Sequence, residues 1–509
     1  MNLTFRISAE IAGRLRRAGA LLVAAAACAW AAGPAYVIED ILTGASPSAS
    51  RSTTWKPGEG LVLEVGGMDF LADGRLAVAI RKGEVWIIDG LSGAAPGGVR
   101  ARLFASGLHE PLGLLRDGEA LLVAQRTEVT RLRDTDGDGV ADEYLTAGRG
   151  WNVSGAYHGY AYGPKRDGAG RLWVALNLDM GDRSDNDAAW RGWAGVIGVG
   201  GVFEPMAAGM RSPCGLGANA AGDMFCVDQQ GTWIPATPIY HLRRGAFFLN
   251  PEGMKSQERS DSPLRLSRPV PNRVPYPEAV RAVPEMRPPA VWLPYNKLGR
   301  SGTDLAVCAA GGGFGPFDGQ LFVGEFTDAK VSRVFLEQID GEYQGAAFPF
   351  VAGLASGVTR VLFGPDHALY VGMTSRGWSS LGTKSYGLQR VRWTGVTPFA
   401  IRAMRVTPGG FELEFTAAVD PATAGDPDAY RMTSYTYLYS NAYGSPELDP
   451  LTAQVTSAEV SADRLRVRLV VEGRRELHVH ELRASGVRSA AGVPLEHPDA
   501  YYTLNRIPR

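Results

Sequence analysis

Residues 67–78 read GMDFLADGRLAV, two short apolar segments on either side of an Ala-Asp-Gly sequence. An Asp-Gly pair between apolar runs favours the tight turns whose twist matches that of two antiparallel strands. The stretch therefore predicts a β-hairpin. A single hairpin cannot bury its own apolar faces, so this unit has to pack against other copies of itself.

The same pattern of apolar segment, turn and apolar segment recurs five more times along the chain. The later copies begin at Leu112, Tyr160, Cys214, Asp304 and Val361. Repeated β-hairpins are typical of a propeller, in which the copies lie side by side and close into a ring. The sequence therefore predicts an all-β protein with a six-bladed β-propeller over residues 32–396.

After Trp393 the repeat ends and a different pattern begins. Residues 411–415 (FELEF) and 465–469 (LRVRL) alternate apolar and charged side chains, as expected for strands with one buried face. This pattern predicts an Ig-like β-sandwich over residues 397–509. The region shows no convergent cluster of polar side chains, so we expect it to be structural or adhesive.

Residues 1–31 are expected to be a signal peptide. Basic residues precede an apolar run from Ala18 to Trp30 that is short for a bilayer span, and Ala29 and Ala31 are small residues suited to cleavage. An uncleaved membrane anchor and a lipid anchor on Cys28 are the open alternatives. We expect a periplasmic or secreted protein with no membrane span in the mature chain.

Charge and cysteine content narrow the classes of partner and cofactor. The chain has 52 basic and 53 acidic residues, and this balance argues against nucleic-acid binding. Cys214 and Cys226 flank a predicted turn and could form a disulfide, while buried free thiols are the alternative. The sequence has no Cys-x-x-Cys-His motif, so no covalently attached haem is expected.

Residues 134–142, DTDGDGVAD, form the sharpest short motif. Its positions 1, 3, 5 and 9 carry carboxylates, on Asp134, Asp136, Asp138 and Asp142. With Gly139 at position 6, this spacing suits an oxygen-seeking cation such as calcium. We expect the loop to join two strands and to bind calcium in a structural role; a solvated acidic hairpin tip is the alternative.

Several polar residues stand where the first strand of a repeat begins or the second strand ends. In a propeller, these positions collect around the mouth of the central channel. They are His158, Arg211 and Arg360 before repeats, and Arg81, Arg126, Asn177, Gln229, Gln230, Gly231 and Arg376 after second strands. A histidine among arginines and amides suits an anionic ligand and a general base, with a purely structural histidine as the alternative.

The segment 243–300 separates the fourth and fifth repeats and is rich in proline from Pro263 to Pro294. Such a run is not expected inside a sheet. We predict a loop over one face of the channel, in which Trp292 and Tyr295 either rim a binding cleft or pin the loop to the ring.

The repeats resemble the glucose/sorbosone dehydrogenase family of propellers that use pyrroloquinoline quinone (PQQ). They are most similar to exported dehydrogenase-like propellers of planctomycete and verrucomicrobial type. His158, followed by Gly163 and Pro164, matches the family's catalytic histidine. Residues 211–215 (RSPCG) resemble its cofactor motif, in which Asn stands at the place of Ser212.

Further cofactor residues follow from this resemblance. Arg360 falls on one of a pair of cofactor arginines, and Val358 stands at the place of the other. Gln230 stands in a stretch that contacts the cofactor, and the carbonyls of Gly231 and Thr232 are the implied ligands of the cofactor's calcium. The resemblance thus implies that Arg211, Arg360 and Gln230 bind PQQ.

The resemblance implies oxidation of a sugar or related alcohol or aldehyde that depends on PQQ and calcium. Electrons would pass to an external acceptor such as a soluble cytochrome. Two alternatives belong to other classes. One is a non-catalytic propeller that binds carbohydrate or protein, and the other is a calcium-dependent lactonase-like hydrolase built on Asp228 and Glu325.

Overall fold

The computed structural model describes residues 33–44, 62–91, 98–153, 155–180 and 188–509. The expected signal peptide and its two alternatives lie outside the described residues. The described part of the chain is almost entirely β-structure. None of its helices is long and apolar enough to cross a membrane.

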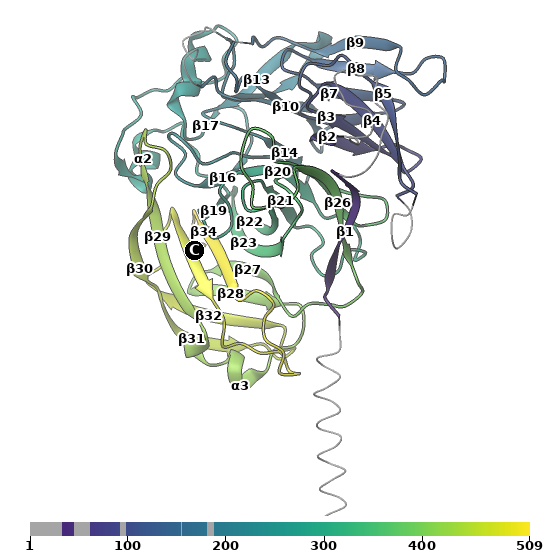
Figure 1. Ribbon diagram of the computed structural model, residues 1–509. Helices are drawn as coiled ribbons and strands as arrows, with labels where there is room; N and C mark the ends of the chain where they lie inside the picture. The colour runs from purple at the N-terminus through teal and green to yellow at the C-terminus, as the bar shows by residue number, and fades with distance from the viewer. Residues whose placement is uncertain (1–32, 45–61, 92–97, 154, 181–187) are drawn as a thin grey trace, which may run out of the picture.

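Six sheets of mainly antiparallel strands follow one another from Tyr36 to Trp393 (Figure 1). Each contains one of the six predicted hairpins, so these predictions are confirmed. The first sheet contains β2 (Val65–Phe70), β3 (Leu76–Ile80), β4 (Glu84–Asp89) and β5 (Arg100–Ala105). The second contains β6 (Leu114–Asp117), β7 (Ala120–Ala124), β8 (Val129–Arg133) and β9 (Glu143–Gly148). The third contains β10 (Ala161–Arg166), β11 (Leu172–Leu176), β12 (Trp193–Ile197), β13 (Phe203–Ala208) and β17 (Ala246–Phe247).

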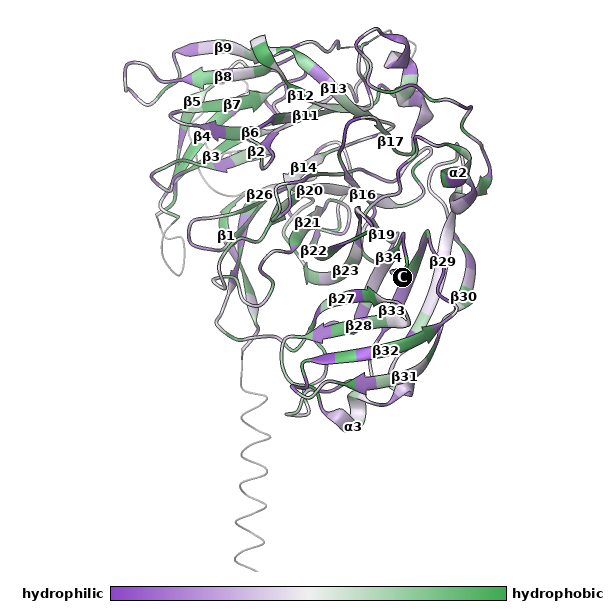
Figure 2. Ribbon diagram, turned by 180° about the vertical axis from the view of Figure 1, so that it is seen from behind, coloured by the Kyte–Doolittle hydropathy of each residue, from purple (hydrophilic) through white to green (hydrophobic). Residues whose placement is uncertain are grey.

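The next three sheets have the same design. The fourth contains β14 (Gly215–Ala218), β15 (Met224–Val227), β16 (Thr237–His241) and β19 (Val291–Leu293). The fifth contains β20 (Gly302–Val307), β21 (Leu321–Glu325), β22 (Lys330–Ile339) and β23 (Glu342–Ala352). The sixth contains β24 (Val358–Phe363), β25 (Leu369–Thr374) and β26 (Tyr386–Trp393), together with β1 (Tyr36–Thr43). The interior strands are strongly apolar. Every residue of β7 is buried, and Figure 2 shows it as one of the apolar strands.

The six sheets are arranged as a ring. Their first strands contact one another in chain order, from β2 through β6, β10, β14 and β20 to β24, and β24 also contacts β2. The N-terminal strand β1 pairs with β26, so both ends of this region meet in the last sheet. The fold is therefore propeller-like.

Glycine permits the closest approach between neighbouring first strands. A Cβ atom at Gly113 would lie only 1.4 Å from the carbonyl oxygen of Gly163, and one at Gly67 would lie 2.5 Å from the carbonyl carbon of Gly113. No larger residue fits these positions unless the backbone shifts. The repeats therefore need glycine here for a packing reason.

The buried side chain of Arg360 lies where the first strands meet. Its guanidinium donates to carbonyl oxygens in or just before five of these six strands, and a ring from the sixth strand faces it. The carbonyls belong to Gly66 at 2.7 Å, Leu112 at 2.5 Å, Thr359 at 2.6 Å, Cys214 at 3.4 Å and Thr303 at 3.5 Å, and the ring of Tyr162 is centred 5.8 Å away. One side chain therefore contacts all six sheets.

The C-terminal region consists of two sheets that enclose a second core. One sheet contains β27 (Ile401–Thr407), β28 (Gly410–Phe415), β32 (Arg466–Glu472) and β31 (Gln454–Val460). The other contains β29 (Arg431–Tyr439), β30 (Glu447–Thr452), β33 (His478–Arg483) and β34 (Asp499–Leu504), and the short helix α3 (Pro421–Ala424) follows β28. Strand β32 alternates exposed and buried residues, as its sequence predicted.

The ring and the C-terminal sheets share one hydrogen-bonded ladder. Strand β34 pairs with β23, with Gly345 opposite Thr503 and Ala347 opposite Tyr501. The fifth sheet of the ring therefore continues directly into the C-terminal region, as Figure 1 shows.

Two expectations about loops and cysteines need correction. The segment 243–300 is not only loop, because it contributes β18 (Val274–Pro275), α2 (Tyr276–Ala282) and β19 to the fold. Trp292 on β19 is 2% exposed, so it pins this segment and does not rim a cleft. Cys214 and Cys226 are buried free thiols, and the disulfide alternative is therefore wrong.

We expect Arg360→Met to lower the free energy of unfolding by about 2–4 kcal/mol, because it leaves several buried carbonyls without donors. The change should appear as a lower urea midpoint. Arg75→Ala is the control, because the Arg75 side chain forms an exposed hairpin ion pair with Asp73, and such pairs contribute about 1 kcal/mol or less. Equal midpoints for both variants would contradict a structural role of Arg360.

Candidate functional site

A cavity of about 170 Å³ opens at one mouth of the ring. Its wall combines residues that follow second strands with residues that precede first strands. Among the residues predicted for the channel mouth, the wall includes Arg81, His158, Asn177, Arg211, Gln229, Arg360 and Arg376. The structure therefore brings these seven side chains to one cavity.

His158 stands in the loop before β10 and is half-buried in the cavity wall. Its ring packs edge-on against the ring of Tyr157, with centroids 5.1 Å apart. Burial and the positive charges of Arg211, Arg126 and Arg81 lower the pKa of the imidazole. Within the described ranges, no residue hydrogen-bonds its ring nitrogens, so His158 is a neutral base with nitrogens free for a ligand.

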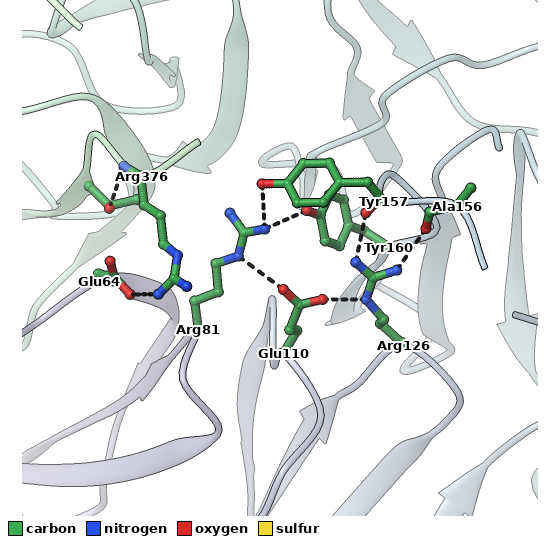
Figure 3. Close-up of polar contacts among 9 residues, drawn as sticks. Glu64, Arg81, Glu110, Arg126, Ala156, Tyr157, Tyr160 and Arg376 are labelled. Carbon is green, nitrogen blue, oxygen red and sulfur yellow. Dashed lines mark hydrogen bonds and ion pairs between the residues drawn. The ribbon is translucent and has the colours of Figure 1, made fainter. Parts of the chain in front are cut away.

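The loop that carries His158 is held by two arginines and one carboxylate (Figure 3). Glu110 accepts from Arg126 and from Arg81, the latter at 3.3 Å between Nε and Oε1. Burial alone would raise the pKa of Glu110, but these two arginines outweigh it and lower the pKa. Arg126 also donates to the carbonyl of Tyr157 at 2.6 Å, so it lies behind the loop and supports it.

Arg81 completes this support from the cavity side. Its guanidinium donates to the hydroxyl of Tyr157 at 2.9 Å and to that of Tyr160 at 2.5 Å (Figure 3). Arg376 is likewise paired, with Glu64 at 2.8 Å. Both cavity arginines therefore have a carboxylate partner within the protein.

Arg211 differs from these arginines, because in the described part of the chain it forms no ion pair. Its buried Nε has no hydrogen-bond partner. The guanidinium lies 5.3 Å from the ring centre of Tyr443 and packs closely on Gly231, where an added Cβ would be 2.2 Å from Nε. Arg211 therefore has donor capacity left for an anionic or polar ligand.

Asp228 sets the backbone position of Arg211. Its buried carboxylate accepts from the amides of Arg211 at 2.8 Å, Ser212 at 2.6 Å and Gln229 at 2.7 Å. Burial raises the pKa of Asp228 to about 6, although the three amides act in the opposite direction. The carboxylate is thus fully used in holding two segments of the cavity wall together.

The other residues expected to bind a cofactor are occupied by contacts within the protein. The donors of Arg360 bond to main-chain carbonyls, and Gln230 donates to the carbonyl of Pro235 at 3.0 Å. The carbonyl of Gly231 accepts the amides of Ile234 and Gly444. The carbonyl of Thr232 accepts from Asn250 at 3.1 Å. The Gly231 carbonyl therefore already accepts two hydrogen bonds, and the Thr232 carbonyl accepts one.

Three exposed aromatic residues of the cavity were not anticipated from the sequence: Tyr157, Trp378 and Tyr443. Tyr157 directly precedes His158 in the sequence, and this position could have indicated that it lies at the cavity. Tyr443 lies in the C-terminal region, and only the docking of that region brings it to the cavity. No sequence pattern pointed to it.

The acidic loop joins β8 to β9 at a separate place in the fold. Asp134, Asp136 and Asp138 each place a carboxylate oxygen within 4.8 Å of the others, and this is the only such group of metal-ligating side chains in the described ranges. The carboxylate of Asp142 instead bonds to Thr135, at 2.8 and 2.9 Å from the hydroxyl. Three of the four predicted ligands are therefore assembled.

Comparison with known proteins gives the family but no assigned activity. Residues 99–372 match the family described as "Domain of unknown function (DUF7133)", which is more than half of the chain. The chain therefore belongs to this family. No curated protein matches it.

Several solved structures similar to the chain are described as sugar dehydrogenases, and one as a luciferin-regenerating enzyme. One, described as an oxidoreductase (glucose dehydrogenase) from Thermus thermophilus, is 19% identical, covers 70% of this chain and 99% of its own, and has a TM-score of 0.47. The PQQ-bound aldose sugar dehydrogenase of Streptomyces coelicolor is 13% identical, with coverage of 71% and 99% and a TM-score of 0.45. The soluble aldose sugar dehydrogenase of Escherichia coli is 16% identical, with coverage of 70% and 99% and a TM-score of 0.44.

We expect the acidic loop to stabilise the fold by binding calcium, because an ion that binds only the folded state raises its stability. EDTA should lower the melting temperature of the wild type, and Asp136→Ala combined with Asp138→Ala should remove this effect. Asp89→Ala changes a surface carboxylate that pairs with Arg100, and this control should keep the sensitivity. A wild type that does not respond to EDTA would favour the solvated hairpin tip.

The pKa of His158 should lie below 6.5, so the imidazole should protonate only as the pH falls through that lower value. Arg211→Met removes one of the charges that lower this pKa and should move it upward. NMR titration of protein labelled at the histidine rings measures both values, with His158→Asn to assign the signal. A pKa above 6.5 in the wild type would contradict the described environment.

Proposed function

We propose that this protein oxidises a sugar or related alcohol or aldehyde, with His158 as the general base. Among the described residues, one cavity holds both a histidine with a lowered pKa and no hydrogen bond to its ring nitrogens and an arginine whose buried Nε has no partner, and this observation carries the proposal. The reaction class comes from the resemblance of the His158 and Arg211 segments to the PQQ-dependent sugar dehydrogenases. Electrons would leave to an external acceptor such as a soluble cytochrome.

The proposal includes the domain organisation expected from the sequence. The six sheets would be six blades over residues 32–396, and residues 397–509 would form an Ig-like sandwich. Residues 1–31 would direct export to the periplasm or the medium. The cyclic contact of the first strands and the core between two C-terminal sheets support the first two points.

The chemistry of the cavity suits removal of a proton from a hydroxyl group. The free ring nitrogen of His158 accepts this proton, since the lowered pKa keeps the imidazole unprotonated at neutral pH. Arg211 then stabilises the negative charge that develops on the substrate oxygen. The ion pairs of Arg81 and Arg126 with Glu110 hold the loop that positions the imidazole.

The donor set fits the carboxylates of PQQ in part. The orphaned Nε of Arg211 suits a carboxylate oxygen, and charge-assisted bonds of this kind are strong. When bound, PQQ supplies the chemistry of accepting a hydride from the alcohol carbon. The carbonyl of Gly231 already accepts two amides, so we assign no step to a calcium ion beside the cofactor.

The geometry does not favour the lactonase-like alternative. The carboxylate of Asp228 is taken by three amides, and that of Glu325 accepts the amides of Arg300, Ser301 and Asp328. In the described ranges, neither belongs to a group of metal-ligating side chains. The non-catalytic binding propeller is the alternative that the assay below distinguishes.

We expect His158→Asn to lower kcat by about 10²–10⁴-fold, the usual contribution of a general base, and to leave PQQ binding largely intact. The assay is dye reduction with added PQQ and calcium and a panel of aldoses, sorbosone and polyols. His367→Asn is the matched control, because His367 lies in an exposed turn at φ 64°, a conformation that asparagine tolerates.

Two outcomes would count against the proposal. If His158→Asn retains the wild-type kcat, the histidine is not the base. If the wild type neither binds PQQ at micromolar concentration nor reduces the dye with any substrate, the oxidation proposal fails and the binding propeller is favoured.

A further inference from the structure

A loop of the C-terminal region docks on the mouth of the ring. This loop, residues 440–446, joins β29 to β30. Its Gly444 amide donates to the carbonyl of Gly231 at 3.0 Å, and its Ser445 amide donates to the carbonyl of Pro235 at 3.0 Å. Tyr443 itself forms a β-bridge with Thr232. The backbone next to Tyr443 is thus hydrogen-bonded to the ring.

Gly444 makes this docking specific in position. Its φ of 68° lies in the left-handed region, and an added Cβ would be 2.6 Å from Nε2 of Gln230. The loop therefore has one close backbone approach to the ring. Gln230, which the sequence suggested as a cofactor ligand, instead forms part of the surface that receives the C-terminal loop.

The docked loop presents Tyr443 to the cavity. The ring lies 5.3 Å from the guanidinium of Arg211, which forms no ion pair with the residues that the structure describes. The side chain nevertheless remains 61% exposed. An aromatic ring and a free guanidinium therefore stand together at the edge of the cavity, one offering an apolar face and the other offering donors.

Exposed aromatic residues are concentrated at this cavity. Of the aromatic side chains that are large and exposed in the described residues, the three most exposed are Tyr157 at 54%, Trp378 at 57% and Tyr443 at 61%, and all three line it. Tyr144 and Tyr295 are less exposed and lie elsewhere. Exposed apolar surface that gathers at one cavity is the mark of a binding site.

The chemistry of the ligand follows from this combination. A sugar ring has a face of C–H groups that packs on an aromatic ring and an edge of hydroxyls that accept and donate hydrogen bonds. Tyr157 contacts the ring of His158, so it lies beside the proposed reacting position. Tyr443 lies beside Arg211 and is the most exposed of the three aromatic side chains, so we place it toward the open side of the cavity.

We propose that Tyr443 forms an outer subsite for a second sugar ring, so that the preferred substrate is an oligosaccharide or the end of a sugar chain. This inference rests on the proposed action on sugars. The C-terminal region then supplies a specificity-determining residue and is part of the substrate site.

The test is calorimetric titration of the full chain with glucose, maltotetraose and cellotetraose, without any electron acceptor. We expect the wild type to bind one of the tetrasaccharides about tenfold more tightly than glucose, the order expected from one added aromatic contact. Tyr443→Ala should reduce this ratio to about one, and Tyr443→Phe should keep it. Tyr144→Ala, an exposed aromatic outside the cavity, is the matched control and should keep it as well.

Each result either supports or overturns the subsite. A wild-type ratio near one for both tetrasaccharides, or a ratio that Tyr443→Ala leaves unchanged, overturns it. Melting temperatures of all variants show whether a loss of binding reflects unfolding. Binding without dye reduction would contradict only the proposed oxidation, whereas dye reduction with a ratio near one would contradict only the subsite.

Discussion

The closed ring depends on one buried cation at its centre. The first strands direct main-chain carbonyls toward the middle, where the side chain of Arg360 is 7% exposed, and buried carbonyls without donors would be costly. Arg360 hydrogen-bonds to these carbonyls through its guanidinium, a planar group that carries five N–H donors in fixed directions. Because carbonyls from most of the sheets share these donors, the relative positions of the sheets are coupled through a single side chain.

In the cavity at the mouth of the ring, some charged or titratable side chains have partners within the protein and others do not. Arg81 and Arg126 share the carboxylate of Glu110, and Arg376 pairs with Glu64, so all three arginines are engaged in ion pairs within the protein. Within the described part of the chain, Arg211 and His158 are left without such partners. A site can thus be recognised here by the groups whose hydrogen-bonding capacity the protein does not use itself, which is a sharper criterion than the presence of arginine or histidine alone.

Prediction from sequence worked where the cause is local. The hairpins follow from Asp-Gly turns between apolar runs, and the place of Arg81 and His158 at the cavity follows from their positions next to predicted strands. It did not work where the cause is tertiary. Trp292 lies in a proline-rich segment yet pairs into a sheet, because prolines flank β19 and do not interrupt it. The hydrogen bond from Gly444 to Gly231 and the position of Tyr443 at the cavity depend on a loop more than 200 residues away in the chain.

The ladder between β23 and β34 has a consequence for how the chain can be divided. Strand β23 is 11 residues long and is the outermost strand of the fifth sheet. Strand β34 pairs with the stretch from Gly345 to Ala347, so without it the outer N–H and C=O groups of this stretch would lose their partners, and open strand edges pair readily with other chains. The C-terminal region therefore acts as an edge cover. A ring produced without the C-terminal region would have an exposed strand edge and would tend to aggregate. The two regions therefore need each other to stay soluble, although they enclose separate cores.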